Sequence, residues 1–398
     1  MIALTDTRAD LFRDALDLLS DKLLEDEQSL GVAFPYVTAP DGRWDTMLAS
    51  VSAGYTGDNW SHGNWFCGFW VGLLLAAHLH RGDDRFLKLA RERIRLVEQR
   101  ADDPNTHDIG FIFISSAVPG HHITHDPELA AAALKAASRL RSRLVRTDRG
   151  AYLSSWGSLD DPRAQCSSAI DTMANLALLY WAARTTGDAS YLVAAEAHAR
   201  MTEAAFIRPD RSTYHAVQYA LPSGERARGY TFQGYADESC WSRGQGWAIL
   251  GFADTAAATG QRHYLELAQD LGDYFMQRIG DDPVAFWDFD DPALPNAPRD
   301  SAASAIVANA FLKLADLDPD QARAGRRREQ GLWLLEGLCR SCLAREPSHR
   351  GLLKHGCYSK PHNIGPDAAV LFGDFYFVEA LCRVTMPGRY GPTLDRLV

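Results

Sequence analysis

Three segments of the sequence repeat one pattern, in which a glycine is followed by a short polar stretch, an aromatic residue, leucine and alanine. They are "HRGDDRFLKLARERI" at 80–94, "TTGDASYLVAAEAHA" at 185–199 and "ATGQRHYLELAQDLG" at 258–272. Glycine after a helix is a common C-cap, and the polar residue that follows it can open the next helix. Each segment therefore predicts the bend of a helical hairpin, and the three copies predict a repeat of such hairpins.

Apolar residues on either side of these bends recur at helical spacing, as at Val71, Leu74 and Leu75, whereas strand-like alternation is scarce. We expect helices near 8–24, 66–81, 84–100, 126–146, 168–185, 189–206, 241–258, 262–279, 301–316, 322–345 and 367–384. A closed ring of about six hairpins leaves no terminal hairpin with an exposed apolar face. The sequence therefore predicts an all-α protein, an (α/α)6 barrel of helical hairpins. Because no long polar linker divides the chain, residues 1–398 are expected to form one domain.

Composition and charge limit the cellular location and the partners that we expect. The first 24 residues are acidic throughout and lack the basic and apolar regions of a signal peptide, which predicts a cytoplasmic protein. The longest apolar runs stop short of the roughly 18 to 20 residues that a membrane span needs, so no membrane partner is expected. A net charge of −10 argues against nucleic acid as a partner. Seven scattered cysteines suggest reduced, mostly buried thiols. The oligomeric state is left open.

Unusual residues gather in the segments between the predicted hairpins. Aromatic, histidine and glycine residues are dense in "NWSHGNWFCGFW", "NTHDIGFIF", "FQGYADESCWSRGQGW" and "KHGCYSKPHNIGPD". These segments precede helices, so they are expected at one mouth of the barrel, and functional residues tend to collect on loops held by a rigid scaffold. Ten tryptophans suggest a sugar-stacking cleft, although each one could equally be a large core residue.

Two aspartates are candidates for acid–base chemistry. Asp171 lies in "CSSAIDTMANLALLYWA", where Ser168, Asp171 and Asn175 would form one polar stripe on an otherwise apolar helix. The alternative is a carboxylate that only favours the helix dipole. Asp108 lies in "HDIGF", where an Asx turn is the alternative. Two aspartates in separate apolar settings are typical of sugar chemistry, in which the surroundings assign the acid and base roles.

An arginine in "SRGQGWAILGF" is a candidate ligand for an anionic group. Arg243 and Trp247 are four residues apart at a helix start, so they would offer a guanidinium beside an aromatic plane. The alternative is an ion pair of Arg243 with Asp237 or Glu238. The sequence contains no phosphate-binding glycine loop, no H-E-x-x-H zinc motif and no G-x-S-x-G nucleophile motif. No metal site and no phosphate-binding loop are therefore expected.

Taken together, these motifs resemble those of the unsaturated glucuronyl hydrolases, glycoside hydrolase family 88. The similar stretches are "WFCGFWVGLL", "HDIGF", "IDTMANLALLYWA", "SRGQGWAILGF", "PRDSAASAIVA" and "GDFYFVEAL", which span roughly residues 60 to 385. The resemblance implies an (α/α)6 barrel without a cofactor. It also implies removal of 4,5-unsaturated glucuronic acid from the non-reducing end of oligosaccharides that polysaccharide lyases leave behind.

The resemblance assigns roles by motif. It implies that Asp171 is the general acid and base and that Asp108 is a second essential aspartate. Apolar neighbours such as Ile170 and Met173 are expected to favour the neutral form of Asp171, which can donate a proton. The implied substrate-binding residues are Trp65, His107, Trp156, His215, Gln233, Arg243 and Trp247.

One element departs from the family pattern. Members that prefer a sulfated neighbouring sugar carry an S-x-x-S-x-K element, and the matching residues here are Ser359, His362 and Ile364. Ser359 and Lys360 are kept as substrate-binding candidates. The departure argues against a preference for a sulfated neighbour, although Lys360 could compensate, so the sulfation preference is left open. Two other functions stay open: an unsaturated rhamnogalacturonyl hydrolase acting on pectin fragments, and a sugar-binding barrel without catalysis.

Overall fold

A computed structural model describes residues 5–56, 59–61 and 63–389. Its α-helices are α1 (Asp6–Leu30), α2 (Cys67–Arg81), α3 (Asp84–Val97), α4 (Ile109–Ile114), α5 (Ala117–Thr124), α6 (Pro127–Arg141), α7 (Thr172–Thr186), α8 (Ala189–Phe206), α9 (Ser242–Thr259), α10 (Arg262–Ile279), α11 (Ser301–Leu317), α12 (Gln321–Ser341) and α13 (Leu371–Thr385). Its strands are β1 (Ala33–Thr38), β2 (Trp44–Leu48), β3 (Gly54–Thr56), β4 (Asn59–Ser61), β5 (Leu144–Thr147), β6 (Gly150–Leu153), β7 (Ser167–Ala169), β8 (Ala216–Ala220) and β9 (Glu225–Tyr230).

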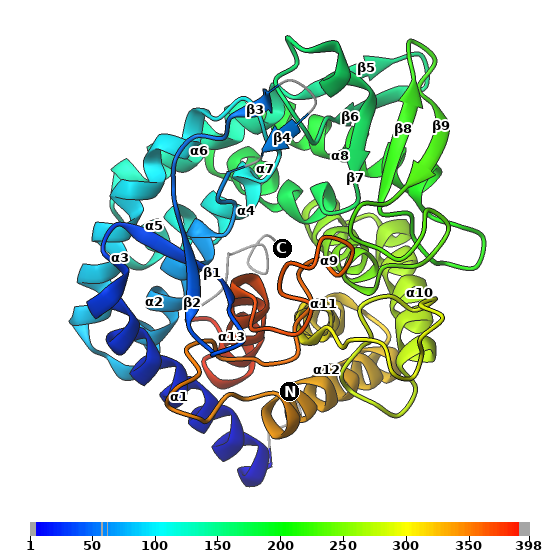
Figure 1. Cartoon of the computed structure of the whole chain (residues 1–398). Helices are drawn as coiled ribbons and strands as arrows, with labels where there is room; N and C mark the ends of the chain where they lie inside the picture. The colour runs from blue at the N-terminus through cyan, green and yellow to red at the C-terminus, as the bar shows by residue number, and fades with distance from the viewer. Residues whose placement is uncertain (1–4, 57–58, 62, 390–398) are drawn as a thin grey trace.

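The helices form two concentric rings (Figure 1). In the inner ring α2, α4, α7, α9, α11 and α13 each contact the next, and α13 returns to α2. The helices α1, α3, α6, α8, α10 and α12 pack outside them. This arrangement confirms the predicted (α/α)6 barrel. In the described part of the chain, no helix has the length and apolar character needed to cross a membrane.

The three repeated segments are the predicted bends. Gly82, Gly187 and Gly260 each follow a helix in the left-handed conformation, with φ of 67°, 72° and 66°, and their N–H groups bond carbonyls of the last turn. A left-handed φ costs glycine nothing, which explains its presence at these ends. Asp83 and Asp188 then accept a hydrogen bond from the first turn of the next helix. The sequence pattern therefore encodes both halves of the hairpin connection.

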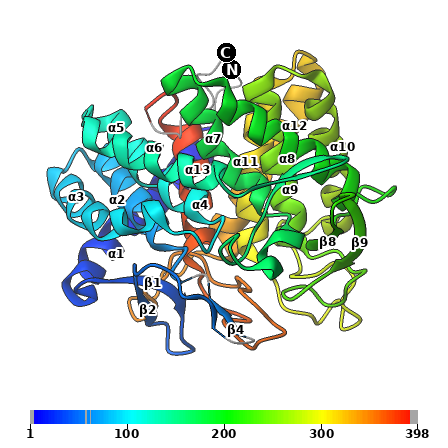
Figure 2. The same cartoon turned by 90° about the horizontal axis from the view of Figure 1, so that it is seen from above.

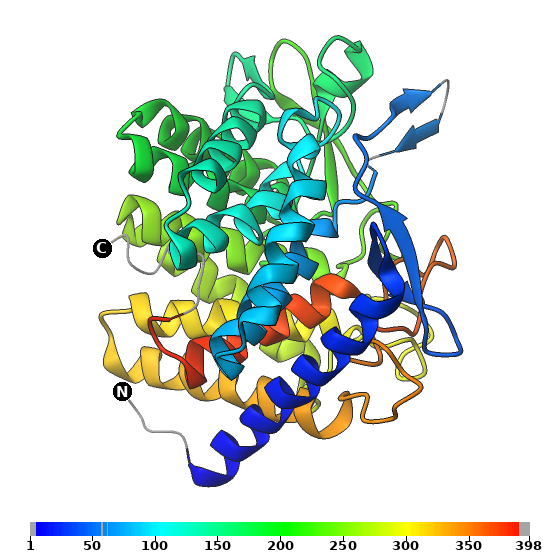
Figure 3. The same ribbon diagram turned by 90° about the vertical axis from the view of Figure 1, so that its left-hand side faces the viewer.

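Short antiparallel strands, which the sequence did not predict, occupy the connections. They form the pairs β1–β2, β3–β4 and β5–β6 and the three-stranded sheet β7–β8–β9. Figure 2 shows strands β1, β2, β4, β8 and β9 at one end of the barrel. In Figure 3, the hairpins β1–β2 and β3–β4 lie beside the helices at this end. β3, β4 and β7 have only three residues each, and the longer strands β1 and β9 do not alternate buried and exposed residues, so hydrophobic alternation does not reveal them.

Several predicted helix boundaries differ from those of the structure. The helix expected at 8–24 extends to Leu30, the one expected at 322–345 ends at Ser341, and the one expected at 367–384 begins at Leu371. Two others differ where a strand replaces part of the expected helix. The helix expected at 168–185 begins at Thr172, because residues 167–169 form β7 and pair with β8. Ser168 therefore does not share a helical stripe with Asp171 and Asn175. The helix expected at 126–146 ends at Arg141, and the chain then enters β5.

Helices α4 and α5 were missed entirely. The apolar run "IGFIFI" that forms α4 is rich in isoleucine and phenylalanine, which favour strands. Every residue of α4 is buried, because this helix belongs to the inner ring. Tertiary packing therefore overrides the local preference of the segment.

Candidate functional site

A cavity of about 300 Å³ opens at the end of the barrel where the inner helices begin. It is lined by Tyr36, Trp65, His107, Asp108, Trp156, Asp171, Phe232, Gln233, Tyr358, Ser359, His362 and Ile364. The aspartates Asp108 and Asp171 directly precede α4 and α7, and Trp65 lies two residues before α2. The hairpin repeat thus brings segments that are distant in sequence to one mouth, as the sequence predicted.

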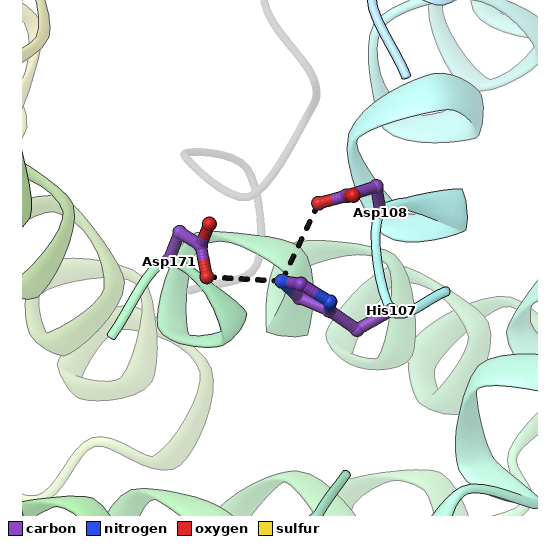
Figure 4. Close-up of side chains that lie close together, drawn as sticks. All are labelled: His107, Asp108 and Asp171. Atoms are coloured by element: carbon purple, nitrogen blue, oxygen red, sulfur yellow. Dashed lines mark hydrogen bonds and ion pairs between the residues drawn. The ribbon is translucent and has the colours of Figure 1, made fainter. Parts of the chain in front are cut away.

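Three ionisable side chains meet in this cavity (Figure 4). Nε2 of His107 lies 2.9 Å from Oδ1 of Asp171 and 3.3 Å from Oδ1 of Asp108. His107 and Asp108 are nearly buried, whereas the Asp171 side chain keeps 17% of its surface exposed. Asp171 is therefore the most accessible of the three to a molecule in the cavity. Its carboxylate lies against an imidazole, so its setting is more polar than the expected apolar one.

The hydrogen bonds of His107 show where one proton lies. Nδ1 of His107 is 2.8 Å from the carbonyl oxygen of Ser155. Because a carbonyl only accepts, Nδ1 carries hydrogen and donates it. The 2.9 Å contact between Nε2 and Asp171 then needs a second proton, which is bound either to the imidazole or to the carboxyl group. Burial alone would lower the pKa of His107, but the carboxylates of Asp108 and Asp171 outweigh burial and raise it to about 9. At neutral pH the ring is thus an imidazolium.

Both aspartates occupy helix N-cap positions without capping through their side chains. Asp108 precedes α4 and Asp171 precedes α7, and neither carboxylate bonds the first turn of its helix. Instead, Oδ2 of Asp108 accepts a hydrogen bond from the Thr106 hydroxyl at 2.8 Å, and Asp171 contacts His107. The helix dipoles favour negative charge at these positions. Both carboxylates nevertheless contact His107. A favourable interaction with the helix dipole therefore does not by itself explain the position of Asp171.

A buried asparagine holds the two aspartate-bearing helices together. Oδ1 of Asn175 accepts a hydrogen bond from the Phe111 N–H of α4 at 2.6 Å, and its Nδ2 donates to the Asp171 carbonyl at 3.1 Å. Gly110 makes this approach possible, since a Cβ there would lie 2.5 Å from Asn175 Oδ1. Asn175 therefore supports the site by joining α4 to α7, and not as a member of the predicted polar stripe.

Aromatic rings form the walls of the cavity. Trp65 stacks on Phe372, with ring centroids 5.2 Å apart, and Trp156 meets Phe232 edge to face at 5.3 Å. Both tryptophans are 8% exposed, so each presents a small part of its ring to the cavity. Rings fixed in this way suit contacts with the faces of a sugar.

The polar wall combines Gln233, from the loop between β9 and α9, with the loop before α13. Nε2 of Gln233 donates to the carbonyl of Tyr358 at 3.0 Å. Ser359 Oγ lies 2.8 Å from Nδ1 of His362, and the segment closes on itself through the Ser359–Ile364 bridge. Gln233 and Ser359 line the cavity as expected.

Arg243 does not line the cavity. Its guanidinium is 1% exposed, forms an ion pair with Asp300, and donates at 2.6 Å to the carbonyls of Cys357 and Tyr358. These bonds satisfy a buried charge and fix the loop that carries Tyr358 and Ser359. The expected contact of Arg243 with a substrate carboxylate does not fit this arrangement, and neither does the alternative pairing with Asp237 or Glu238.

Three further candidates also lie outside the cavity lining. Trp247 is 1% exposed and packs on Phe111 and Tyr376 in the core beneath the cavity. Lys360 pairs with Asp291 at 2.6 Å and thus points its charge away from the lining residues.

His215 lies behind Phe232, between that ring and the ring of Trp241, at centroid distances of 4.1 and 4.4 Å. Burial lowers the pKa of His215 to about 3, so its ring is neutral. Its carbonyl accepts the Ile170 N–H at 2.9 Å, which fixes the chain just before Asp171.

The sequence missed five lining residues. His362 and Ile364 were compared with the family's sulfate-linked element but were not kept as candidates. Tyr36 comes from β1, far from every motif, and no local signal marked it. Phe232 and Tyr358 lie in loops that were recognised as aromatic-rich, but nothing in the pattern distinguished them from their neighbours.

The triad of His107, Asp108 and Asp171 is also the one group of His, Cys and acidic residues in the described ranges whose ligand atoms are close enough for a metal ion, within 4.8 Å. Coordination through Nε2 would have to displace the proton between His107 and Asp171. The absence of a metal site thus stays a prediction.

Comparison with known proteins places this site in a family. No family model matches the chain. The unsaturated glucuronyl hydrolase of Bacillus sp. (strain GL1) is 34% identical over 326 residues, which cover 81% of this chain and 86% of that protein. Its crystal structure superposes with a TM-score of 0.85 over 94% of this chain and 98% of that one, at 31% identity.

Two further relatives agree with this match. The unsaturated chondroitin disaccharide hydrolase of Streptococcus agalactiae serotype III (strain NEM316) is 30% identical over 331 residues, covering 80% of this chain and 81% of that protein. An unsaturated glucuronyl hydrolase specific for heparin matches with a TM-score of 0.85 and 25% identity over 95% of this chain and 97% of that one. The fold, the triad and these similarities lead to one conclusion: the chain belongs to the unsaturated glucuronyl hydrolases, glycosidases of glycoside hydrolase family 88.

Proposed function

We propose that this protein releases 4,5-unsaturated glucuronic acid from the non-reducing end of lyase-generated oligosaccharides. The observation that carries the proposal is the 2.9 Å contact between Nε2 of His107 and Oδ1 of Asp171 in an aromatic cavity. The reaction begins by protonation of a carbon atom, so it needs an acid at the substrate. The cavity volume of about 300 Å³ is at the lower end of ligand pockets, which suits one chain end better than a chain interior.

The reaction follows from the chemistry of a vinyl ether. Asp171 passes the proton to C4 of the unsaturated sugar, and positive charge develops at C5 and the ring oxygen. Water adds at C5, and its released proton returns to the His107–Asp171 pair. The hemiketal then collapses and the neighbouring sugar leaves. Because the anomeric carbon is not attacked, the carboxylate spacing that separates retaining from inverting glycosidases does not apply.

The other two members of the triad have distinct roles in this proposal. His107 supplies the proton to Asp171 and is held in orientation by Ser155. Asp108 stabilises the imidazolium and the positive charge that develops on the sugar ring. Its own orientation is fixed by Thr106.

Substrate contacts are proposed for the lining residues alone. Trp65 and Trp156 would contact the sugar faces, while Gln233 and Ser359 would bond its oxygens. Lys360 is held by Asp291, which also argues against a preference for a sulfated neighbour. Residues 1–398 would act as one catalytic domain, and a cytoplasmic location stays a prediction from the sequence.

The test uses Asp171→Asn. Turnover is followed as loss of the ultraviolet absorbance of the conjugated double bond, with unsaturated disaccharides from hyaluronan, chondroitin, heparin, gellan and pectin. We expect the wild-type protein to act on glucuronyl substrates and Asp171→Asn to lose at least 10³-fold in kcat, within the range that acid–base catalysis contributes, while still binding substrate. Near-normal rates in the variant would refute the role of Asp171.

A matched control is Asp188→Asn, which changes another helix N-cap aspartate, on α8 and away from the cavity. Asparagine caps helices about as well as aspartate, so this variant should fold and keep its activity. Activity only on the pectin product would favour the rhamnogalacturonyl alternative, and binding without turnover by the wild-type protein would favour a sugar-binding barrel.

A further inference from the structure

A second hollow lies on the outside of the barrel and shares no lining residue with the cavity. It has a volume of about 670 Å³ and lies between α8, the β5–β6 turn and the β8–β9 turn. Figure 1 shows these elements together at one corner of the ring. Three arginines line it, Arg149, Arg200 and Arg226, and we call it the arginine groove.

Arginines outnumber the acidic residues that line this groove, in a chain whose net charge is −10. Glu225 is the one acidic residue that lines it against the three arginines. A neighbouring hollow shares Arg200 and Ala204 with the groove and adds Arg208 and Arg211 with Glu203. Arginines therefore continue along α8 and beyond its end, where Arg208 and Arg211 are paired with Glu238 and Asp270.

The arginines keep hydrogen-bond donors for a ligand. A guanidinium has five N–H donors. In the described part of the chain, Arg200 bonds Glu196 at 2.6 Å, and Arg226 donates to the Ala205 carbonyl at 2.7 Å. Arg149 pairs with Glu225, and both side chains remain more than half exposed. One carboxylate or carbonyl uses at most two of these donors, so several remain on each arginine.

The groove is built on a fixed frame. The β5–β6 and β8–β9 turns are joined by hydrogen bonds from the N–H groups of Asp148 and Arg149 to the carbonyls of Pro222 and Ser223, at 3.0 and 3.2 Å. Its lining between the arginines consists largely of the small residues Gly150, Ala151, Ala197, Ala204, Ala205 and Gly224. Small residues leave room for a broad ligand to approach the backbone closely.

The groove is also connected to the cavity through one strand. β9 starts at Glu225 in the groove and ends at Tyr230, just before Phe232 and Gln233 of the cavity. At about 3.3 Å per residue, the path from Arg226 to Gln233 is at most about 23 Å. The two sites therefore lie near opposite ends of β9.

We propose that the arginine groove is a second binding site, for the carboxylate or sulfate groups of an acidic polysaccharide. The choice of ligand rests on the proposed function, because a protein that acts on the ends of acidic sugar chains meets such polymers. The groove would hold the enzyme near its substrates without taking part in catalysis. Guanidinium groups on a rigid frame match carboxylate and sulfate geometry.

Direct binding tests the proposal without turnover. Saturated fragments of hyaluronan, which carry only carboxylates, and of heparin, which also carry sulfates, are titrated by calorimetry into the wild-type protein, with neutral dextran fragments for comparison. We expect both acidic polymers to bind, more weakly as salt is raised from about 0.05 M to about 0.3 M, and dextran not to bind.

The variants locate the site. Arg149→Gln and Arg200→Gln should each weaken binding by roughly two- to fivefold, and the triple variant with Arg226→Gln by about tenfold or more. Arg340→Gln is the matched control for Arg200→Gln, since both arginines are 57% exposed and pair with a glutamate one helical turn earlier. The control should bind as the wild type does.

Several outcomes would overturn the proposal: no binding of either acidic polymer, equal losses in the control and the groove variants, or equally tight, arginine-dependent binding of single-stranded DNA. All single variants should hydrolyse unsaturated disaccharides within about twofold of the wild-type rate. If the wild-type protein does not hydrolyse them, the proposed function fails, whereas polymer binding still tests the groove.

Discussion

Replacement of His107 by glutamine tests the electrostatics of the triad. The wild-type imidazolium lies between Asp108 and Asp171, which raise its pKa to about 9 despite its burial. Glutamine can still donate a hydrogen bond to Asp171, but it carries no charge. The variant therefore removes the dependence of folding stability on protonation of residue 107, while it keeps a polar side chain in place.

The magnitude follows from the pKa shift. A rise from 6.5 to about 9 corresponds to about 3 kcal/mol, at about 1.4 kcal/mol per unit. The pKa of His107 is higher in the folded state, so the folded protein binds more protons than the unfolded chain between these values. This stabilisation is complete below about pH 6.5 and is lost as the pH rises through about 9.

The assay is urea unfolding, followed by tryptophan fluorescence, of wild type and His107→Gln at about pH 6 and about pH 9.5. The wild-type advantage in the free energy of unfolding should shrink by about 3 kcal/mol between the two conditions. His263→Gln, which changes an exposed histidine paired with Glu203, serves as the control. A wild-type advantage that is the same at both pH values, within about 0.5 kcal/mol, would refute an imidazolium between two carboxylates.

Three other predictions test the support of the site. Asn175→Ala should lower the free energy of unfolding by about 2–4 kcal/mol, because the buried Phe111 N–H loses its acceptor and a second bond is lost; a urea midpoint like that of the wild type would contradict this. Arg243→Met should cost about 3–5 kcal/mol in the same assay by leaving Asp300 buried without its partner, and adding Asp300→Asn should recover part of that loss; an unchanged double variant would count against the pair. Lys360→Met should change kcat/KM for an unsulfated unsaturated disaccharide by less than about twofold, since Nζ is bound to Asp291 rather than lining the cavity; a tenfold loss would place Lys360 at the substrate.

Local features of the sequence were sufficient to predict the architecture. The bends at Gly82, Gly187 and Gly260 each require a left-handed residue at a helix end, and only glycine adopts that conformation without cost. Their repetition, together with the helical spacing of apolar residues, predicted the closed ring. The motifs around Asp108 and Asp171 also marked both carboxylates, because the loops before inner helices of such a ring meet at one end.

The tertiary structure decided which residues share the cavity and how they are oriented. The contact between His107 and Asp171 spans 64 residues and depends on the Asn175 bridge and on the Ser155 carbonyl. No local pattern encodes such a distance.

Arg243 and Tyr36 both show that residue type and motif do not reveal which side chains line the cavity. Arg243 has the residue type of an anion ligand, yet its guanidinium is consumed by Asp300 and two carbonyls. Tyr36 belongs to no motif, yet β1 brings it to the cavity wall. The sequence by itself determined the hairpins and the chemistry available at their ends, because both depend on neighbours along the chain. The packing of those hairpins alone decided burial, pairing and the contact between His107 and Asp171, because these depend on residues far apart in sequence.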